Sequence, residues 1–222
     1  NMTNLTTSVE TVPAAWAGHG GRGLTSTIVA AEVEPTCHPL GAKNKLVIAP
    51  GLLSGTVAAN SGRLSIGGKS PLTGTIKEAN AGGTAAQLLA RAGCKALIIE
   101  GLPKDDAWYS LALTPEGVTI QEETELIGKG NFAVIETLAS RFKEKLGVLT
   151  IGQAGEMRMS SANISIKDPD GGLRSCGRGG LGAVMGSKKI KFITVDPKDG
   201  KVAIANLAGV PSIIYGLLAL GL

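Results

Sequence analysis

The sequence predicts an α+β fold built on mixed or antiparallel β-sheets with a few helices. Runs rich in β-branched residues outnumber helical segments, and the two kinds do not alternate strictly along the chain. With 222 residues, 43% of them hydrophobic, the chain can bury a substantial core. Its 32 glycines and 3% aromatic content favour a backbone that approaches a ligand closely over an aromatic core.

The expected elements follow from local pattern. Helical spacing covers 84–93, with Gly93 as C-cap, and 131–147, with Asn131 as N-cap, and a short helix is expected after Gly182. The runs 108–114 and 117–123 indicate a hairpin. The expected strands are 45–50, 63–68, 96–101, 108–114, 117–123, 147–152, 161–167 and 190–196.

Composition narrows the class of protein. The net charge of +4 comes from basic residues that alternate with acidic ones, which favours a small anionic ligand and no nucleic acid. Cys37, Cys94 and Cys176 lie far apart, so we expect no disulfide framework and a cytoplasmic location. The apolar stretch 211–222 is too short to span a membrane, and we expect a helix that packs against a partner surface.

Two glycine clusters in the first third of the chain suggest ligand contacts. Residues 18–23 match G-x-G-x-x-G, but no strand leads into them, so a glycine-rich turn and an anion contact through Arg22 both remain open. In 61–74, Arg63 stands where a P-loop needs glycine, which excludes that motif. The segment then has two interpretations. It could bind a ligand through an arginine on a strand and a proline turn with free backbone donors, or it could be a hairpin with incidental surface charges.

Two further clusters precede expected helices. Residues 78–83 would leave helix N–H groups facing a phosphate, and Asn80 would either cap that helix, the commoner role, or present oxygens to Mg²⁺. Residues 174–188 open a helix but are separated from the preceding strand, and this separation argues against a nicotinamide-binding domain. Arg174 and Arg178 there suit a multi-phosphate or fused-ring ligand. No nucleophile and base are paired, so chemistry would come from a cofactor or another chain.

Taken in order, these segments resemble the N-terminal domain of the aldehyde:ferredoxin oxidoreductase family over about residues 18–196. The resemblance implies a two-sheet base that holds two pyranopterin cofactors, which chelate one tungsten or molybdenum atom, and a Mg²⁺ that links their phosphates. It implies that Mg²⁺ is bound by the backbone carbonyls of Asn80 and Ser175. Cys176 replaces the family's usual alanine, with an effect on either the pocket or the packing. The cofactor-binding residues that we expect are Arg22, Arg63, Asn80, Gly82, Arg174, Ser175, Gly177 and Arg178.

The resemblance further implies that cofactor binding and catalysis lie in different domains of a longer protein. Residues 1–200 would form the pterin-binding domain and 201–222 a connector toward C-terminal domains that carry a [4Fe–4S] cluster and the acid/base residues. The whole protein would oxidise aldehydes to carboxylic acids and pass electrons to ferredoxin, with no catalytic residue in this segment, which alone would be inactive. The alternatives are a non-catalytic pterin-binding or scaffold subunit completed by a partner chain, and an ordinary nucleotide-binding domain. A homodimer is one assembly that we consider for the whole protein.

Overall fold

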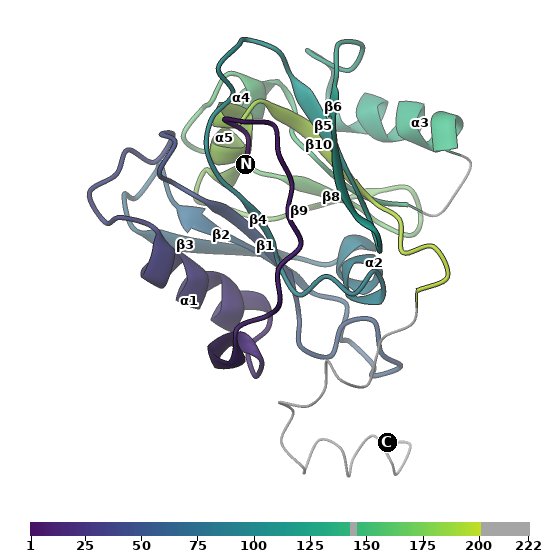
Figure 1. The fold of residues 1–222 in the computed structure, drawn as a ribbon. Helices are drawn as coiled ribbons and strands as arrows, with labels where there is room; N and C mark the ends of the chain where they lie inside the picture. The colour runs from purple at the N-terminus through teal and green to yellow at the C-terminus, as the bar shows by residue number, and fades with distance from the viewer. Residues whose placement is uncertain (143–145, 201–222) are drawn as a thin grey trace.

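A computed structural model describes residues 1–142 and 146–200, which form two β-sheets with helices between and around them (Figure 1). Sheet A is antiparallel, with strand order β3-β2-β1-β4. Its strands are β1 (Leu46–Pro50), β2 (Leu64–Lys69), β3 (Ile76–Ala81) and β4 (Leu97–Ile99). The expected connector, 201–222, lies outside the described residues.

Sheet B is mixed, with strand order β6-β5-β10-β7-β8-β9. Only the β5–β10 pair among these described strands is parallel. The strands are β5 (Tyr109–Thr114), β6 (Gly117–Glu122), β7 (Gly147–Thr150), β8 (Ser165–Lys167), β9 (Leu173–Ser175) and β10 (Ile190–Val195). The α+β class is confirmed, and each expected strand, including the two of the hairpin, overlaps an observed one.

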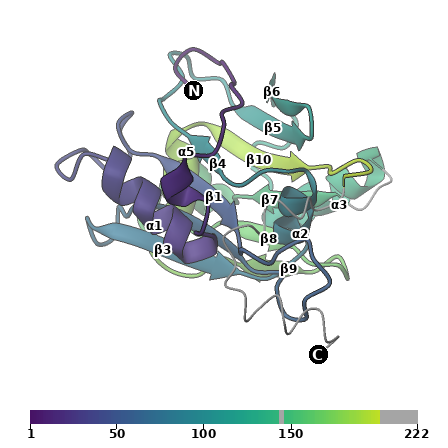
Figure 2. The same ribbon diagram turned by 60° about the horizontal axis from the view of Figure 1, so that its bottom comes forward.

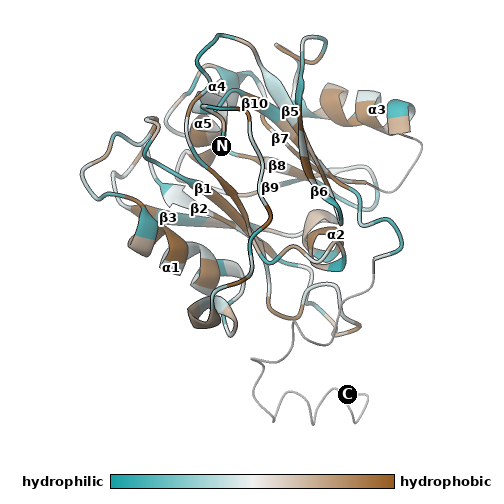
Figure 3. Cartoon of the chain, in the orientation of Figure 1, coloured by the Kyte–Doolittle hydropathy of each residue, from teal (hydrophilic) through white to brown (hydrophobic). Residues whose placement is uncertain are grey.

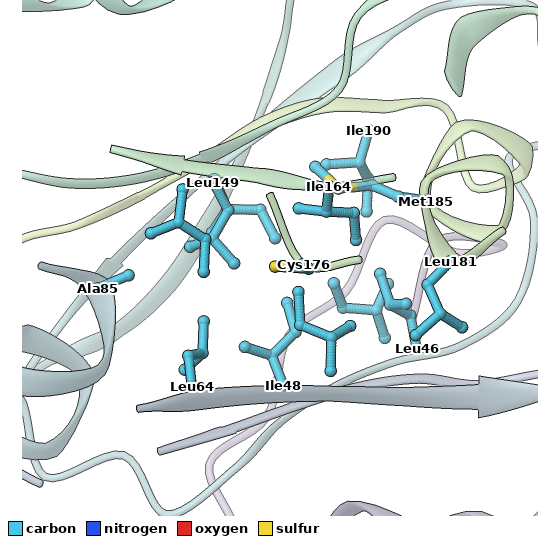
Figure 4. Close-up of a cluster of buried hydrophobic side chains, with 14 of the residues drawn as sticks. Leu46, Ile48, Leu64, Ala85, Leu149, Ile164, Cys176, Leu181, Met185 and Ile190 are labelled. Atoms are coloured by element: carbon cyan, nitrogen blue, oxygen red, sulfur yellow. The ribbon is translucent and has the colours of Figure 1, made fainter. Parts of the chain in front are cut away.

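The main core lies between the two sheets. Leu46, Ile48 and Leu64 of sheet A face Leu149 and Ile190 of sheet B in one buried cluster (Figure 4). Helices α2 (Ala85–Arg91) and α5 (Leu181–Ser187) add buried side chains to the same cluster. The sheets are therefore held in a fixed relation by one continuous apolar layer.

Two longer helices cover outer faces. Helix α1 (Gly21–Glu32) packs Leu24, Ile28 and Val29 on sheet A. Hydrophobic and hydrophilic residues, brown and teal in Figure 3, both occur along it. Helix α3 (Asn131–Phe142) packs on sheet B, and α4 (Gln153–Glu156) contacts α5. No helix among the described residues is long and apolar enough to cross a membrane.

The structure corrects four local predictions. Gly21 begins a helix that we did not expect, so the 18–23 cluster is not only a turn. The segment 76–81 is a strand instead of a helix lead-in, and β9 was also unexpected. Asn131 is the first residue of α3, where Val134 N–H donates to the carbonyl of Gly130, so Asn131 is not the N-cap. The polar sequence of 76–81 does not favour a strand, and the β-branched residues of α1 do not favour a helix.

Lys188 is fully buried where α5 meets sheet A. Its Nζ donates to the carbonyl oxygens of Asn44, at 2.7 Å, and Gly101, at 3.1 Å. Burial is the largest effect on this group and lowers its pKa to about 8. The two carbonyls therefore satisfy the ammonium without a contacting carboxylate.

The lowered pKa of Lys188 predicts a specific pH dependence of stability. Because the folded pKa lies below the unfolded value, the burial cost is fully present below about pH 8 and is relieved as the pH rises toward the unfolded pKa. The shift corresponds to roughly 3 kcal/mol. We expect the free energy of unfolding of the parent chain to rise relative to Lys188→Met between about pH 8 and 10. A constant difference between the two chains across this range would contradict the expectation.

Candidate functional site

Two sheet edges and one loop converge on a single face. Strand β3 is an edge of sheet A and β9 is an edge of sheet B, while α1 lies along β3 and β1 (Figure 2). The loop after β9 reaches sheet A, because Ser70 Oγ donates to the carbonyl of Gly179 at 2.7 Å in a buried position. Edge strands keep backbone groups that no neighbouring strand uses. A ligand held by both sheets could reach such groups here.

A surface pocket of about 520 Å³ opens between α1, β3 and this loop. Four of the expected residues line it together, although they are distant in sequence: Arg22, Asn80, Gly177 and Arg178. The remaining lining residues are Ser26, Ile76, Lys77, Glu78, Ala79 and Cys176.

Arg63 joins the pocket through Asn80. Its Nε donates to Asn80 Oδ1 at 2.7 Å, and Asn80 Nδ2 donates to Ser65 Oγ at 3.2 Å. The Asn80 side chain is thus occupied on strand β3, and it does not cap helix α2, which begins after Thr84. A Cβ placed on Gly82 would lie 3.6 Å from Arg63 Nη1, so the guanidinium runs alongside this glycine.

Three arginines are held in the same manner. Arg22 Nε donates to Glu78 Oε2 at 3.0 Å, and Arg174 Nε donates to Asp168 Oδ2 at 2.7 Å, as Arg63 Nε does to Asn80. A guanidinium has five N–H donors, and these contacts use only the inner one. The outer nitrogens keep the fork geometry that matches a phosphate.

The residues of β9 do not line the pocket, although residues 176–178, which follow them directly, do. Arg174 is 61% exposed beside Asp168 and does not line the pocket. Ser175 is exposed and pairs with Ser165 of β8. The thiol of Cys176 points into the core between the sheets (Figure 4), where burial raises its pKa to about 12. Cys176 is therefore a packing residue. Gly177, with φ +74° and open space around it, leaves its backbone uncovered.

The turn that ends the second cluster is held by contacts within the protein. Lys69 Nζ donates to the carbonyls of Pro35 and Cys37, so its charge is already engaged. The backbone N–H groups of Leu72 and Thr73 donate to Ser70 Oγ at 3.1 Å. The expectation that this turn leaves its backbone donors free is wrong for these two groups.

The paired glycines of the third cluster form a junction between the sheets. Gly83 has φ +104°, and a Cβ there would lie 2.8 Å from Ile166 Cγ2 and from the carbonyl of Lys167. Thr84 N–H donates to that same carbonyl at 3.1 Å. The Thr84 N–H is therefore not available to a phosphate at the start of α2, contrary to expectation.

Glu78 is a pocket residue that the sequence motifs did not predict. Its side chain is only 9% exposed, and its Oε1 has no hydrogen-bond partner among the described residues. Glu78 precedes Asn80 by two positions, so the strand period places both on one face of β3. That signal would have been visible in the sequence had the segment been recognised as a strand.

The donor set fits a phosphate-bearing, cation-linked cofactor. Arg22, Lys77 and Arg178 bring positive charge to one pocket, and Glu78 contributes a buried oxygen that lacks a partner. Within residues 1–142 and 146–200, no three His, Cys, Asp or Glu side chains are grouped to hold a metal ion. Arginine forks and backbone carbonyls suit phosphate oxygens and a hard cation respectively.

Several known proteins are similar in sequence to this chain. Tungsten-containing aldehyde ferredoxin oxidoreductases of Thermococcus kodakarensis and Pyrococcus furiosus are each 40% identical over 181 residues, covering 80% of this chain and 28% of theirs. The WOR-like subunit of an aliphatic sulfonate oxidoreductase of Pyrococcus furiosus is 31% identical, over 79% of this chain and 29% of that protein. The chain thus spans less than a third of the length of these relatives.

A solved structure shares the fold. It is described as the active site complex BamBC of benzoyl coenzyme A reductase with 1,5-dienoyl-CoA, and it matches with a TM-score of 0.77 and 32% identity over 87% of this chain and 28% of that one. The family model for the aldehyde ferredoxin oxidoreductase N-terminal domain matches residues 1–197. This chain belongs to the aldehyde ferredoxin oxidoreductase family and comprises its N-terminal domain.

Proposed function

We propose that residues 1–200 bind the phosphate side of a tungsten bis-pyranopterin cofactor within a longer oxidoreductase. The observation that carries this proposal is the pocket that gathers Arg22, Asn80, Gly177 and Arg178 from three separate segments. The relatives that are 40% identical are tungsten-containing, which favours tungsten over molybdenum in this proposal. When bound, the metal cofactor supplies the redox chemistry, and the protein positions it.

Each residue has a distinct proposed role. Arg63 and Arg178 neutralise cofactor phosphates, and Arg174 extends the positive charge along β9. The backbone carbonyls of Asn80 and Ser175, one on each edge strand, are the proposed ligands of a Mg²⁺ ion. Fixing Arg63 through Asn80 lowers the ordering cost when a phosphate binds.

The proposed reaction is the oxidation of an aldehyde to a carboxylic acid, with electrons leaving through a [4Fe–4S] cluster to ferredoxin. The cluster and the acid/base residues are assigned to the remainder of a longer protein, because the relatives extend well beyond the matched region. We assign the reaction to the cytoplasm, in keeping with three unpaired cysteines. The segment by itself is expected to be inactive.

A second candidate is a subunit that completes its site with a separate chain. Two of the matched proteins are described as a subunit or as part of a complex, which favours this arrangement. The mass of the native protein decides between them. A single polypeptide of relative-like length supports the first candidate, and a short chain that copurifies with a cluster-bearing partner supports the second.

Arg63→Ala and Asn80→Asp in the longer protein test the site. With tungstate supplied to the host, we expect each variant to retain roughly a tenth of the tungsten per polypeptide. Arg63→Ala loses charge-assisted hydrogen bonds to a phosphate, and Asn80→Asp adds a negative charge beside one. Arg91→Ala, which removes a charge from α2 outside the pocket, is the matched control and should retain its metal. Unchanged metal in both site variants would refute the assignment.

A further inference from the structure

Glu78 is the only carboxylate among the described residues that line the pocket. Coulombic repulsion from Glu78 should weaken the binding of a phosphate there. Its presence beside Arg22, Lys77 and Arg178 therefore calls for a role that outweighs this repulsion. The contacts of its two oxygens suggest that role.

The two oxygens of Glu78 differ sharply. Oε2 accepts a hydrogen bond from Arg22 Nε at 3.0 Å, whereas Oε1 is buried without a partner among the described residues. The Glu78 side chain is 9% exposed, while that of Arg22 is 76% exposed. A buried carboxylate with one unsatisfied oxygen depends strongly on its remaining contact. Arg22 is thus drawn onto β3 by a fixed acceptor.

The neighbouring arginine follows the same arrangement. Asn80, two residues along the same face of β3, holds Arg63 through Nε. Strand β3 therefore presents two side-chain acceptors in register, each bound to the inner nitrogen of one arginine. Both guanidinium groups keep their outer nitrogens for another partner.

We infer that Glu78 is a positioning residue that holds Arg22 by Nε and directs its outer nitrogens to a phosphate group in the pocket. This inference rests on the proposed function in one respect, namely that the pocket binds cofactor phosphates. The arrangement makes Arg22 the counterpart of Arg63, so that one strand sets the geometry of both. Pre-ordering the guanidinium removes part of the entropy cost of binding.

The sign of the effect of mutation separates positioning from simple repulsion. With the 222-residue chain and Mg²⁺-pyrophosphate as the probe in calorimetric titrations, repulsion alone predicts tighter binding for both Glu78→Gln and Glu78→Ala. Positioning predicts that Glu78→Gln, which keeps an acceptor for Arg22, binds at least as tightly as the parent. Glu78→Ala should bind roughly three- to tenfold more weakly, although it removes the same negative charge.

The same substitution in an Arg22→Ala background provides the control. Without the guanidinium, only repulsion remains, and Glu78→Ala should then tighten binding or leave it unchanged. Weaker binding on Glu78→Ala in both backgrounds, or tighter binding in both, would overturn the inference.

A second measurement does not depend on any ligand. The order parameter of the Arg22 Nε–H group, measured by ¹⁵N relaxation, should be high in the parent and Glu78→Gln and should fall in Glu78→Ala. Arg63 is the internal control, because Asn80 holds it in every variant. Equal order of Arg22 in parent and Glu78→Ala would overturn the positioning role. Ordered Arg22 with no binding of the probe would instead count against the proposed function.

Discussion

Replacing Gly186 by alanine is expected to lower the free energy of unfolding by about 3 kcal/mol, because its Cβ would overlap the backbone carbonyl of Gly155. Gly186 lies in the buried helix α5, and Gly155 lies in α4, which packs against it. Alanine in a helix normally stabilises relative to glycine, so the expected sign is opposite to that of helix propensity. Urea denaturation of the 222-residue chain measures the difference.

Gly23→Ala is the matched control for Gly186→Ala. Gly23 is also helical, in α1, but the nearest neighbour of an added Cβ would be His19 Cδ2, at 4.0 Å. We expect this substitution to stabilise the chain by about 0.5–1 kcal/mol. If Gly186→Ala were as stable as Gly23→Ala, the close contact of α4 with α5 would be wrong.

Replacing Glu156 by glutamine is expected to cost about 3 kcal/mol, because it leaves a buried ammonium without its carboxylate. Lys191 is fully buried; its Nζ contacts Glu156 Oε1 and the carbonyls of Lys129 and Ile151, both at 2.8 Å. Burial lowers the pKa of Lys191, and Glu156 opposes that shift. Glutamine would let the pKa of Lys191 fall further, so the loss should shrink as the pH rises and Lys191 is deprotonated.

The double variant Glu156→Gln/Lys191→Met tests the origin of this loss. Removing both charges also removes the uncompensated ion, so the double variant should unfold at a higher urea concentration than Glu156→Gln alone. Additive losses from the two single substitutions would show that the pair is not coupled.

The sequence predicted the buried strands because their composition matched their environment. Strands β1 and β10 are completely buried and rich in Val and Ile, so local preference and tertiary burial agree. The opposite holds for β3, whose polar sequence reflects its edge position and the pocket that Glu78 and Asn80 line. Helix α1 was missed because Thr25, Ile28 and Val29 favour strands until sheet A buries them.

The candidate site was predictable as a set of motifs but not as a set of contacts. The glycine motifs together with the family resemblance singled out Arg63, Asn80 and Arg178, whereas the pairing of Arg22 with Glu78 depends on α1 crossing β3. The glycines of the last motif also have two roles that spacing does not separate. Gly177 is open to a ligand, while Gly186 is required for helix packing.

Elemental analysis together with pterin quantification tests the central claim most directly. The measurement requires the longer protein that contains this segment, prepared anaerobically from a host supplied with tungstate. We expect one tungsten and two pterins per polypeptide, with tungsten reduced in Arg63→Ala and retained in Arg91→Ala. Protein that contains neither pterin nor tungsten, or that binds a nicotinamide or ATP resin in their place, would contradict it.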